Sequence, residues 1–436
     1  MRKDCSNIVE RVSTIPIKVA RVIARLNTGG PAIHAISLAK ELPQKGFDCR
    51  LYTGVIAKDE EDMSPVAVKQ GIQLFVIPEL SREISLIKDV QVFIRLFVEL
   101  RKFRPDILHT HTAKAGTIGR LVALFVRIPV RIHTFHGHVF HGYFGNLKTH
   151  IFLWIERMLA LFTDCLVVLC QSQKKELVDT YRIAHERKVH IVPLGFDFSS
   201  YPAERHCREE KRREWQLTST QFVYGFVGRL VHIKNPGLFV QAVELLFQEQ
   251  HAKQEPDTKF DCLIAAIIVG GGILEGSLST LITEQALNGK ISLVGWQSDM
   301  ANVYAALDVV VLTSLNEGTP VALIEAMAAS KPFISTNVGG VKDLMAGKGS
   351  VYAEENGEQF IVYDNGILVE SQNVESLCAA LRYLANHQEH GREMGRIGRS
   401  LVLQNFGLDR LVSDVHDLYV HVLANKGILV SDSEMR

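Results

Sequence analysis

The 436-residue sequence lacks the features of several protein classes. Its seven cysteines are scattered without a C-x-x-C pair, which argues against a disulfide framework or a cysteine zinc site and is typical of cytosolic proteins. Lys plus Arg equals Asp plus Glu, at 48 each, so no net field attracts nucleic acid. No run of about 18 uncharged apolar residues occurs, and the N-terminal segment lacks the apolar core of a signal peptide. We therefore expect a soluble, cytoplasmic protein.

Apolar strand-like runs alternate with helical periodicities along most of the chain. Such alternation predicts parallel sheets covered by helices on both faces. It occurs twice, which predicts one α/β domain over residues 15–198 and a second over 221–405. The charged segment 199–220 predicts a linker or surface helix between them, and residues 406–436 contain a final helical pattern.

The most informative stretch runs from Thr313 to Gly340 and reads TSLNEGTPVALIEAMAASKPFISTNVGG. It follows a predicted buried strand, and Pro320 is well placed as the first residue of a helix. That helix is apolar on every side except at Glu325, which predicts a buried carboxylate in need of hydrogen-bond donors. Glu317 precedes the same helix, where backbone amides without partners favour phosphate. Two carboxylates beside a helix N-terminus indicate a sugar-nucleotide site, and the alternative is that Glu325 pairs with a distant Arg or Lys.

Two other loops follow predicted strands, at the strand ends where doubly wound domains bind ligands. Gly29 and Gly30 permit a tight turn and close approach of a ligand to the backbone, although such a turn can be purely structural. The pattern is not G-x-G-x-x-G, which argues against a dinucleotide site. Arg229 and Lys234 lie before a helix, where two cations either clamp a diphosphate or are simply solvated.

Histidines gather at two strand ends, in the segments HTHT and HTFHGHVFHGY. Metal binding is the obvious interpretation of such a cluster. Against it, no H-E-x-x-H occurs, and no carboxylate lies between Asp106 and Glu156. Neutral imidazoles at strand ends commonly hydrogen-bond substrates, so we favour a ligand site without metal.

Residues 86–103 form an amphipathic helical pattern with basic residues on or near its polar side, at Lys88, Arg95, Arg101, Lys102 and Arg104. A basic amphipathic helix can lie on a membrane surface. An ordinary surface helix that covers a sheet explains the pattern equally well. Peripheral contact with the inner face of the cytoplasmic membrane is therefore one of two hypotheses.

The glutamate stretch EGTPVALIEAMAASKP resembles the donor-site signature of retaining nucleotide-sugar glycosyltransferases with the GT-B fold. It is most similar to family 4 (glycosyl transferases group 1) of the bacterial surface-polysaccharide type, with Ser330 where a glycine is usual. The glycine, histidine, Arg/Lys and glutamate motifs follow the family's order from Val19 to about Phe406. The resemblance implies an α/β fold of two Rossmann-like doubly wound domains that face each other across a cleft, with the final helix packed back on the first domain.

The resemblance also implies a role for each motif. Glu325 would hold the ribose hydroxyls and Glu317 the sugar hydroxyls, while fixed cations stabilise the leaving diphosphate. The implied catalytic residues are His136, Glu317, Arg229 and Lys234. The implied donor-binding residues are Gly29, Gly30, Arg229, Lys234, Gly295, Glu317, Gly318, Thr319, Pro320, Val321 and Glu325. His111, His138 and His141 are candidates for acceptor contacts, and Trp296 either contacts the base or packs in the core.

The activity implied by the resemblance is transfer of a hexose or N-acetylhexosamine from a nucleoside-diphosphate sugar to a glycan or lipid-linked acceptor. Family frequency favours uridine diphosphate, and the family needs neither a metal nor another cofactor. No carboxylate motif for a covalent glycosyl-enzyme is evident, and the family retains the anomeric configuration. The alternatives are a nucleotide-sugar 2-epimerase on the same fold and a non-catalytic, glycosyltransferase-like binding subunit.

Overall fold

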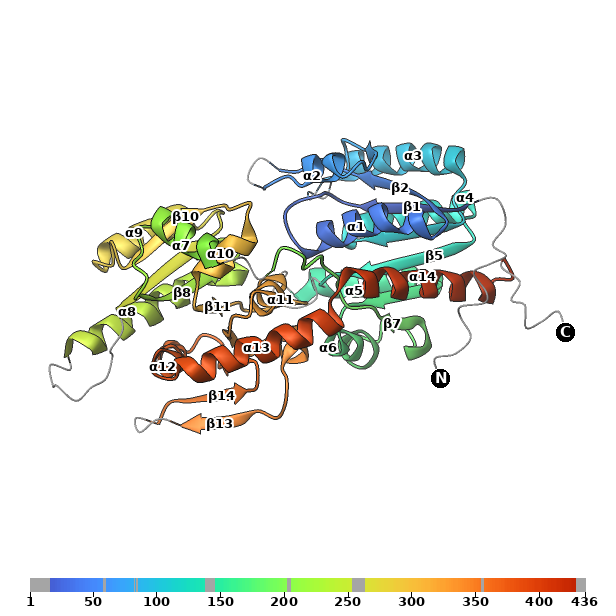
Figure 1. The fold of residues 1–436 in the computed structure, drawn as a ribbon. Coiled ribbons are helices and arrows are strands. Elements are labelled where there is room, and N and C mark those ends of the chain that lie inside the picture. Colours follow the sequence, from blue (N-terminus) through green and yellow to red (C-terminus); the bar gives the residue numbers. More distant parts are fainter. Residues whose placement is uncertain are drawn as a thin grey trace. The chain divides into compact units, whose positions relative to one another are not determined.

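The computed structural model describes residues 16–57, 60–81, 83, 85–137, 146–201, 205–252, 263–353 and 357–428. The chain divides into two compact units (Figure 1). The first contains the described residues up to Phe196 together with those from Leu408 onward, and the second contains those in Asp197–Gly407. Each unit is built on one sheet of its own.

The first unit has a parallel seven-stranded sheet in the order β3-β2-β1-β4-β5-β6-β7. Its strands are β1 (Ile17–Ile23), β2 (Phe47–Thr53), β3 (Leu74–Val76), β4 (Ile107–His111), β5 (Val130–Phe135), β6 (Cys165–Val168) and β7 (Val189–Ile191). Its helices are α1 (Gly30–Glu41), α2 (Ser64–Lys69), α3 (Leu86–Phe103), α4 (Ala113–Val126), α5 (Asn146–Leu161), α6 (Gln171–Lys175) and α14 (Leu408–Asn425). The strand order reverses between β1 and β4, and such a switch point is where doubly wound sheets bind ligands.

The alternation of side chains along β1 assigns its two faces to different helices. Val19 lies in a cluster with residues of α1 and α14, including Leu38 and Tyr419. Ala20 and Val22 lie in a second cluster with residues of α3 and α4. The terminal helix α14 thus helps to cover the sheet of the first unit.

The second unit has an eight-stranded sheet in the order β10-β9-β8-β11-β12-β15-β14-β13, parallel except at β13 and β14. Its strands are β8 (Phe222–Val227), β9 (Ile264–Val269), β10 (Ile291–Gly295), β11 (Val309–Leu312), β12 (Phe333–Thr336), β13 (Ser350–Ala353), β14 (Gln359–Tyr363) and β15 (Gly366–Val369). Its helices are α7 (Arg205–Glu214), α8 (Pro236–Ala252), α9 (Glu275–Glu284), α10 (Met300–Ala306), α11 (Val321–Ala328), α12 (Val374–Asn386) and α13 (Gln388–Asn405). Two parallel-dominated, Rossmann-like sheets with helices are the fold class that the sequence predicts.

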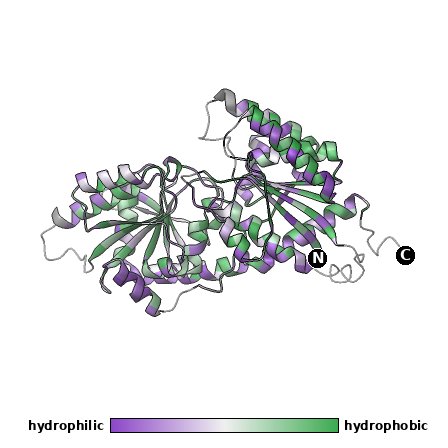
Figure 2. Cartoon of the chain, turned by 90° about the horizontal axis from the view of Figure 1, so that it is seen from above, coloured by the Kyte–Doolittle hydropathy of each residue, from purple (hydrophilic) through white to green (hydrophobic). Residues whose placement is uncertain are grey.

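Hydropathy explains why these segments form sheet centres. Every residue of β4, β8, β9 and β11 is buried, as expected for parallel strands covered on both faces. In Figure 2 the strands of both sheets are coloured mostly as hydrophobic, whereas the helices carry both colours. Within the part of the chain that the structure describes, no helix combines the length and the apolarity needed to cross a bilayer.

Segment 199–220 contains the helix α7, which agrees with the second of the two predicted alternatives, but this helix lies within the second unit and is no linker. The guanidinium groups of Arg208 and Arg212 each donate to the Asp308 carboxylate at 2.6 Å. Arg212 also donates to the carbonyl of Ala306 at 2.9 Å and is buried. The charges that suggested a solvated segment therefore anchor this helix beside β11.

Candidate active site

One group of candidate residues surrounds Glu317 in the second unit. Glu317 Oε1 accepts hydrogen bonds from the Lys234 ammonium at 2.5 Å and from the Ser314 hydroxyl at 2.5 Å. The side chains of Glu317 and Lys234 are only 8% and 20% exposed. Thr313 follows β11, and its hydroxyl donates to the carbonyls of Lys234 and Asn235 at 3.1 and 2.8 Å. Two loops that are far apart in sequence are thus fastened together at the carboxyl end of β11.

The loop after β12 lies against the backbone of Glu317. The amide of Gly340 donates to the Glu317 carbonyl at 3.1 Å. Gly339 has a φ of +49°, and a Cβ at this position would lie 1.9 Å from the same carbonyl oxygen. Only glycine allows both this backbone conformation and this close approach.

The N-terminus of α11 is open to an anionic ligand. The helix begins at Val321, with Pro320 as its N-cap residue rather than its first helical residue. Among the described residues, no side chain caps this helix and its first turn carries no acidic group. The hydroxyl oxygen of Thr319 is buried and finds no hydrogen-bond partner in the described part of the chain. Backbone amides without intrahelical acceptors, next to an unpartnered hydroxyl, suit a phosphate group.

Glu325 lies further along α11 and is half-buried rather than fully buried as predicted. Burial raises the pKa of its carboxyl to about 7, and a hydrogen bond from the Tyr304 hydroxyl at 2.9 Å opposes this rise. No described cation forms an ion pair with it. The alternative in which a distant Arg or Lys neutralises Glu325 is therefore wrong for the described residues. Tyr304, on α10, is a site residue that the sequence analysis missed.

Arg229 follows β8 and is partly exposed, and its guanidinium has no hydrogen-bonding or ion-pairing partner among the residues that the structure describes. Gly295 ends β10, and its carbonyl accepts from the Gly270 amide at 2.9 Å. The Trp296 side chain lies over Gly271, where a Cβ would come within 2.4 Å of its Nε1 atom. Because Trp296 is 39% exposed, it does not pack in the core, and it is available to a ligand.

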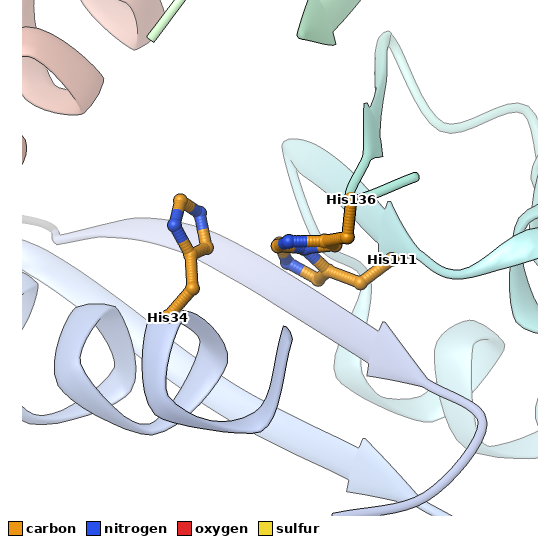
Figure 3. A group of neighbouring side chains, drawn as sticks. All are labelled: His34, His111 and His136. Atoms are coloured by element: carbon orange, nitrogen blue, oxygen red, sulfur yellow. The ribbon is translucent and has the colours of Figure 1, made fainter. Parts of the chain in front are cut away.

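A second group of candidate residues lies in the first unit, at the switch point between β1 and β4. His111 ends β4, His136 follows β5, and His111 Nδ1 lies 3.0 Å from His136 Nε2. Figure 3 shows His34, from α1, facing these two rings, and its ring centroid is 5.0 Å from that of His136. Gly30 begins α1 and Gly29 precedes it, so the glycine turn belongs to the same unit as this cluster.

Burial lowers the pKa of His34, His111 and His136, and it lowers that of His136 to about 3. The three imidazoles are therefore neutral near pH 7. One ligand nitrogen from each ring lies within 4.8 Å of the other two. His138 and His141, the other predicted acceptor contacts, lie outside the described residues.

Comparison with known sequences assigns each half of the chain to a family. The model for glycosyl transferases group 1 matches residues 207–401, and the model for glycosyltransferase family 4 matches residues 28–200. The Escherichia coli UDP-Gal:alpha-D-GlcNAc-diphosphoundecaprenol alpha-1,3-galactosyltransferase is 28% identical over 411 residues, which cover 94% of this chain and 98% of that protein. The Staphylococcus aureus capsular polysaccharide biosynthesis glycosyltransferase CapM is 24% identical over 351 residues, or 79% and 84% of the two chains.

Solved structures of the GT-B fold superpose on almost the whole chain. Anabaena HepE in complex with UDP-glucose matches with a TM-score of 0.72 and 16% identity, and covers 93% of this chain and 100% of its own. Sucrose-phosphate synthase from Thermosynechococcus elongatus matches with a TM-score of 0.75 and 18% identity, at 94% and 100% coverage. Together with the two family matches, these similarities show that the chain belongs to the GT-B glycosyltransferases of group 1.

Proposed function

We propose that this glycosyltransferase moves a hexose or N-acetylhexosamine from a UDP-sugar to a glycan or lipid-linked acceptor, with retention of the anomeric configuration and without a metal. The observation that carries the proposal is the Lys234–Glu317 pair beside the uncapped N-terminus of α11. The name of the Escherichia coli relative, which specifies a UDP-sugar donor and a diphosphoundecaprenol-linked acceptor, supports the choice of substrates.

The donor would be held by cations at its diphosphate and by carboxylates at its hydroxyl groups. Lys234 and Arg229 supply positive charge for the diphosphate, which becomes more negative as the glycosidic bond breaks. Because these two side chains would supply the positive charge that a metal ion otherwise provides at the leaving group, they support the proposal that the enzyme needs no metal. Glu325 offers carboxylate oxygens to the ribose hydroxyls, and Glu317 offers its second oxygen to the hydroxyls of the sugar.

A lipid-linked acceptor would bring the enzyme to a membrane surface, and α3 suits such a surface. It buries Val92, Leu96, Leu100 and Phe103 against the sheet. Its outward side exposes a second apolar stripe of Leu86, Ile87, Val90, Ile94 and Val98, at 83, 77, 58, 56 and 40%. Phe125 of α4 is 68% exposed and packs edge-on against Phe93. Exposed apolar side chains next to cations suit an anionic bilayer better than a solvated helix surface.

The test uses the UDP-sugars of glucose, galactose and their N-acetylated forms with a diphosphoundecaprenol-linked N-acetylhexosamine, in the presence of EDTA. We expect one donor to yield an α-linked product from its α-configured nucleotide, as read from the anomeric proton coupling by NMR. A β-linked product would refute retention, and activity restored only by added metal would refute metal independence. An epimerised nucleotide sugar without transfer would favour the 2-epimerase, and a folded protein that leaves every donor unchanged would favour the binding subunit.

A further inference from the structure

The three histidines at the switch point look like a metal site, because their nitrogens converge and two of the rings carry nitrogens without a hydrogen-bond partner in the described part of the chain. Both ring nitrogens of His34 and Nδ1 of His136 are buried with no hydrogen-bond partner in the described part of the chain. His34 is only 1% exposed. Such buried, unpartnered nitrogens call for a ligand. Whether that ligand is a cation or an oxygen atom depends on which nitrogen of each ring carries the proton.

Arg21 decides the proton positions. It lies on β1, is fully buried, and forms no ion pair with any described carboxylate. Its Nη1 atom is 3.5 Å from His111 Nε2. A guanidinium group can only donate and remains charged. The lone pair of His111 Nε2 therefore faces Arg21, and a neutral His111 must carry its proton on Nδ1.

The same reasoning extends to His136. His111 Nδ1–H donates to His136 Nε2 across 3.0 Å, so that Nε2 is an acceptor. A neutral His136 then carries its only proton on Nδ1, which is the unpartnered atom. His136 thus presents an N–H group that lacks an acceptor.

A second chain of hydrogen bonds also starts at Arg21 and runs in the same direction, from donor to acceptor. Arg21 Nη2 donates to the Tyr419 hydroxyl at 2.9 Å, and this hydroxyl lies 2.6 Å from His109 Nδ1. Arg21 Nη1 also lies 3.4 Å from His109 Nδ1, so this nitrogen is an acceptor, and the hydroxyl donates its own proton to it. His109 Nε2 then donates to the Thr134 hydroxyl at 2.7 Å. Every hydrogen bond of this second chain is satisfied by one set of proton positions, which supports the proton positions assigned to His111 and His136.

The proton positions assigned to His111 and His136 disfavour a metal ion. Coordination by His111 Nδ1 would force its proton onto Nε2, directly against the guanidinium of Arg21. A divalent cation would also share the pocket with a buried positive charge and with no described carboxylate. An oxygen atom of a hydroxyl or phosphate group meets neither obstacle.

We propose that Arg21 is a positioning residue that fixes the tautomers of His111 and His136, so that His136 presents Nδ1–H as a donor to an oxygen atom of the bound substrate. The identity of that oxygen as part of a sugar nucleotide rests on the proposed function. The proton positions do not, and they exist in the protein before any substrate binds.

The test is a two-bond ¹H–¹⁵N correlation spectrum of the full chain labelled with ¹⁵N-histidine, with signals assigned by loss in His111→Gln and His136→Gln. Without substrate, we expect His111 and His136 each to show one neutral tautomer protonated at Nδ1. Protonation of His136 at Nε2 would overturn the proposal. Because the spectrum requires no turnover, its outcome is independent of any transferase assay.

Two variants separate the role of Arg21 from general packing. In Arg21→Met, which keeps much of the aliphatic stem but not the donor, we expect a second tautomer of His111 and His136 to appear, whereas Arg21→Lys, which keeps a charged donor, should retain the single one. A folded Arg21→Met protein with unchanged tautomers would overturn the role of Arg21. If Arg21→Met does not fold, the wild-type spectrum still decides the proton positions, and Arg21→Gln, which removes the charge but keeps a polar side chain, replaces it as the test of Arg21. One equivalent of Zn²⁺ should leave these signals unchanged, and a stoichiometric shift of all three histidines would refute the oxygen-binding assignment.

Discussion

Lys234 Nζ lies 2.5 Å from Glu317 Oε1, although the two residues are 83 positions apart in the sequence. Lys234 comes from the loop that precedes α8, and Glu317 from the loop that precedes α11. The same Glu317 oxygen also accepts from Ser314, so the carboxylate fixes the ammonium in place before a ligand arrives. A preorganised cation of this kind needs no rearrangement when charge develops on a leaving group.

Removal of the Lys234 ammonium should weaken UDP binding. A hydrogen bond from a charged group contributes about 1.5–3 kcal/mol, so we expect Lys234→Ala to raise the Kd for UDP by roughly 10- to 100-fold. Isothermal titration calorimetry measures this change. Lys348→Ala, which removes an exposed lysine of the same unit, is the matched control and should bind UDP as the wild type does. Equal affinities of the two variants for UDP would show that Lys234 does not bind the donor.

Glu325 should make stability depend on pH. Its pKa rises from 4.5 to about 7 in the folded protein, so its contribution to the free energy of unfolding is fully present below the unfolded-state pKa of 4.5 and is lost as the pH rises through 7. Glu325→Gln abolishes this dependence. A shift of one pKa unit corresponds to about 1.4 kcal/mol, and we reduce the resulting energy because the side chain is half-buried. We therefore expect the free energy of unfolding of the variant to exceed that of the wild type by roughly 2 kcal/mol at pH 8 and to equal it near pH 4.

Chemical denaturation at a series of pH values measures this difference. Glu284→Gln on α9 replaces an exposed glutamate and should show no comparable trend. The prediction fails if Glu325→Gln is less stable than the wild type at pH 8. The same carboxylate should also make UDP binding weaken as the pH falls below 7, since the ribose hydroxyls donate to its ionised form.

Gly339→Ala should disturb the donor site through the backbone. A left-handed conformation costs a non-glycine residue about 1–2 kcal/mol, and here the new Cβ would also meet the Glu317 carbonyl at 1.9 Å. Gly289→Ala is a suitable control, because Gly289 has a φ of +80° with nothing within 4 Å of its Cβ position. We expect both variants to lose stability in thermal unfolding, but only Gly339→Ala to lose UDP affinity. Unchanged UDP binding by Gly339→Ala would show that the loop after β12 lies outside the donor site.

The apolar stripe on α3 should determine membrane binding. We expect sedimentation with vesicles of phosphatidylglycerol and phosphatidylethanolamine for the wild type, and loss of sedimentation when Val90 and Ile94 are both replaced by glutamate. Val351 on β13 of the second unit is 67% exposed, so Val351→Glu tests whether any added negative charge has the same effect. Co-sedimentation of the double variant at the wild-type level would leave α3 as an ordinary surface helix.

Some features were predictable from sequence because they depend on local patterns. β8 and β11 are uninterrupted apolar runs, and every one of their residues is buried. The spacing of Glu317 and Glu325 places one before α11 and one within it. These positions follow from strand hydropathy and from helix start signals, which act over a few residues.

Other features depend on contacts between distant segments and could not be predicted in this way. Tyr304 donates to Glu325 from α10, a helix in which the sequence analysis identifies no site residue. Arg21 gave a signal that was overlooked, since a charged residue in the middle of the strand IKVARVI, in addition to Lys18 near its start, is unusual for a buried strand. Its partner Tyr419 lies 398 residues away, and no local pattern relates the two.

We propose above that the second unit binds a uridine diphosphate sugar through Lys234, Arg229 and the two glutamates. Calorimetric titration of the purified protein with UDP, GDP and ADP in the presence of EDTA tests it most directly. We predict binding of one UDP per chain, little affinity for the other two nucleotides, and a marked loss in Lys234→Ala. A folded protein that binds none of the three would contradict the donor site, and with it the proposed transfer.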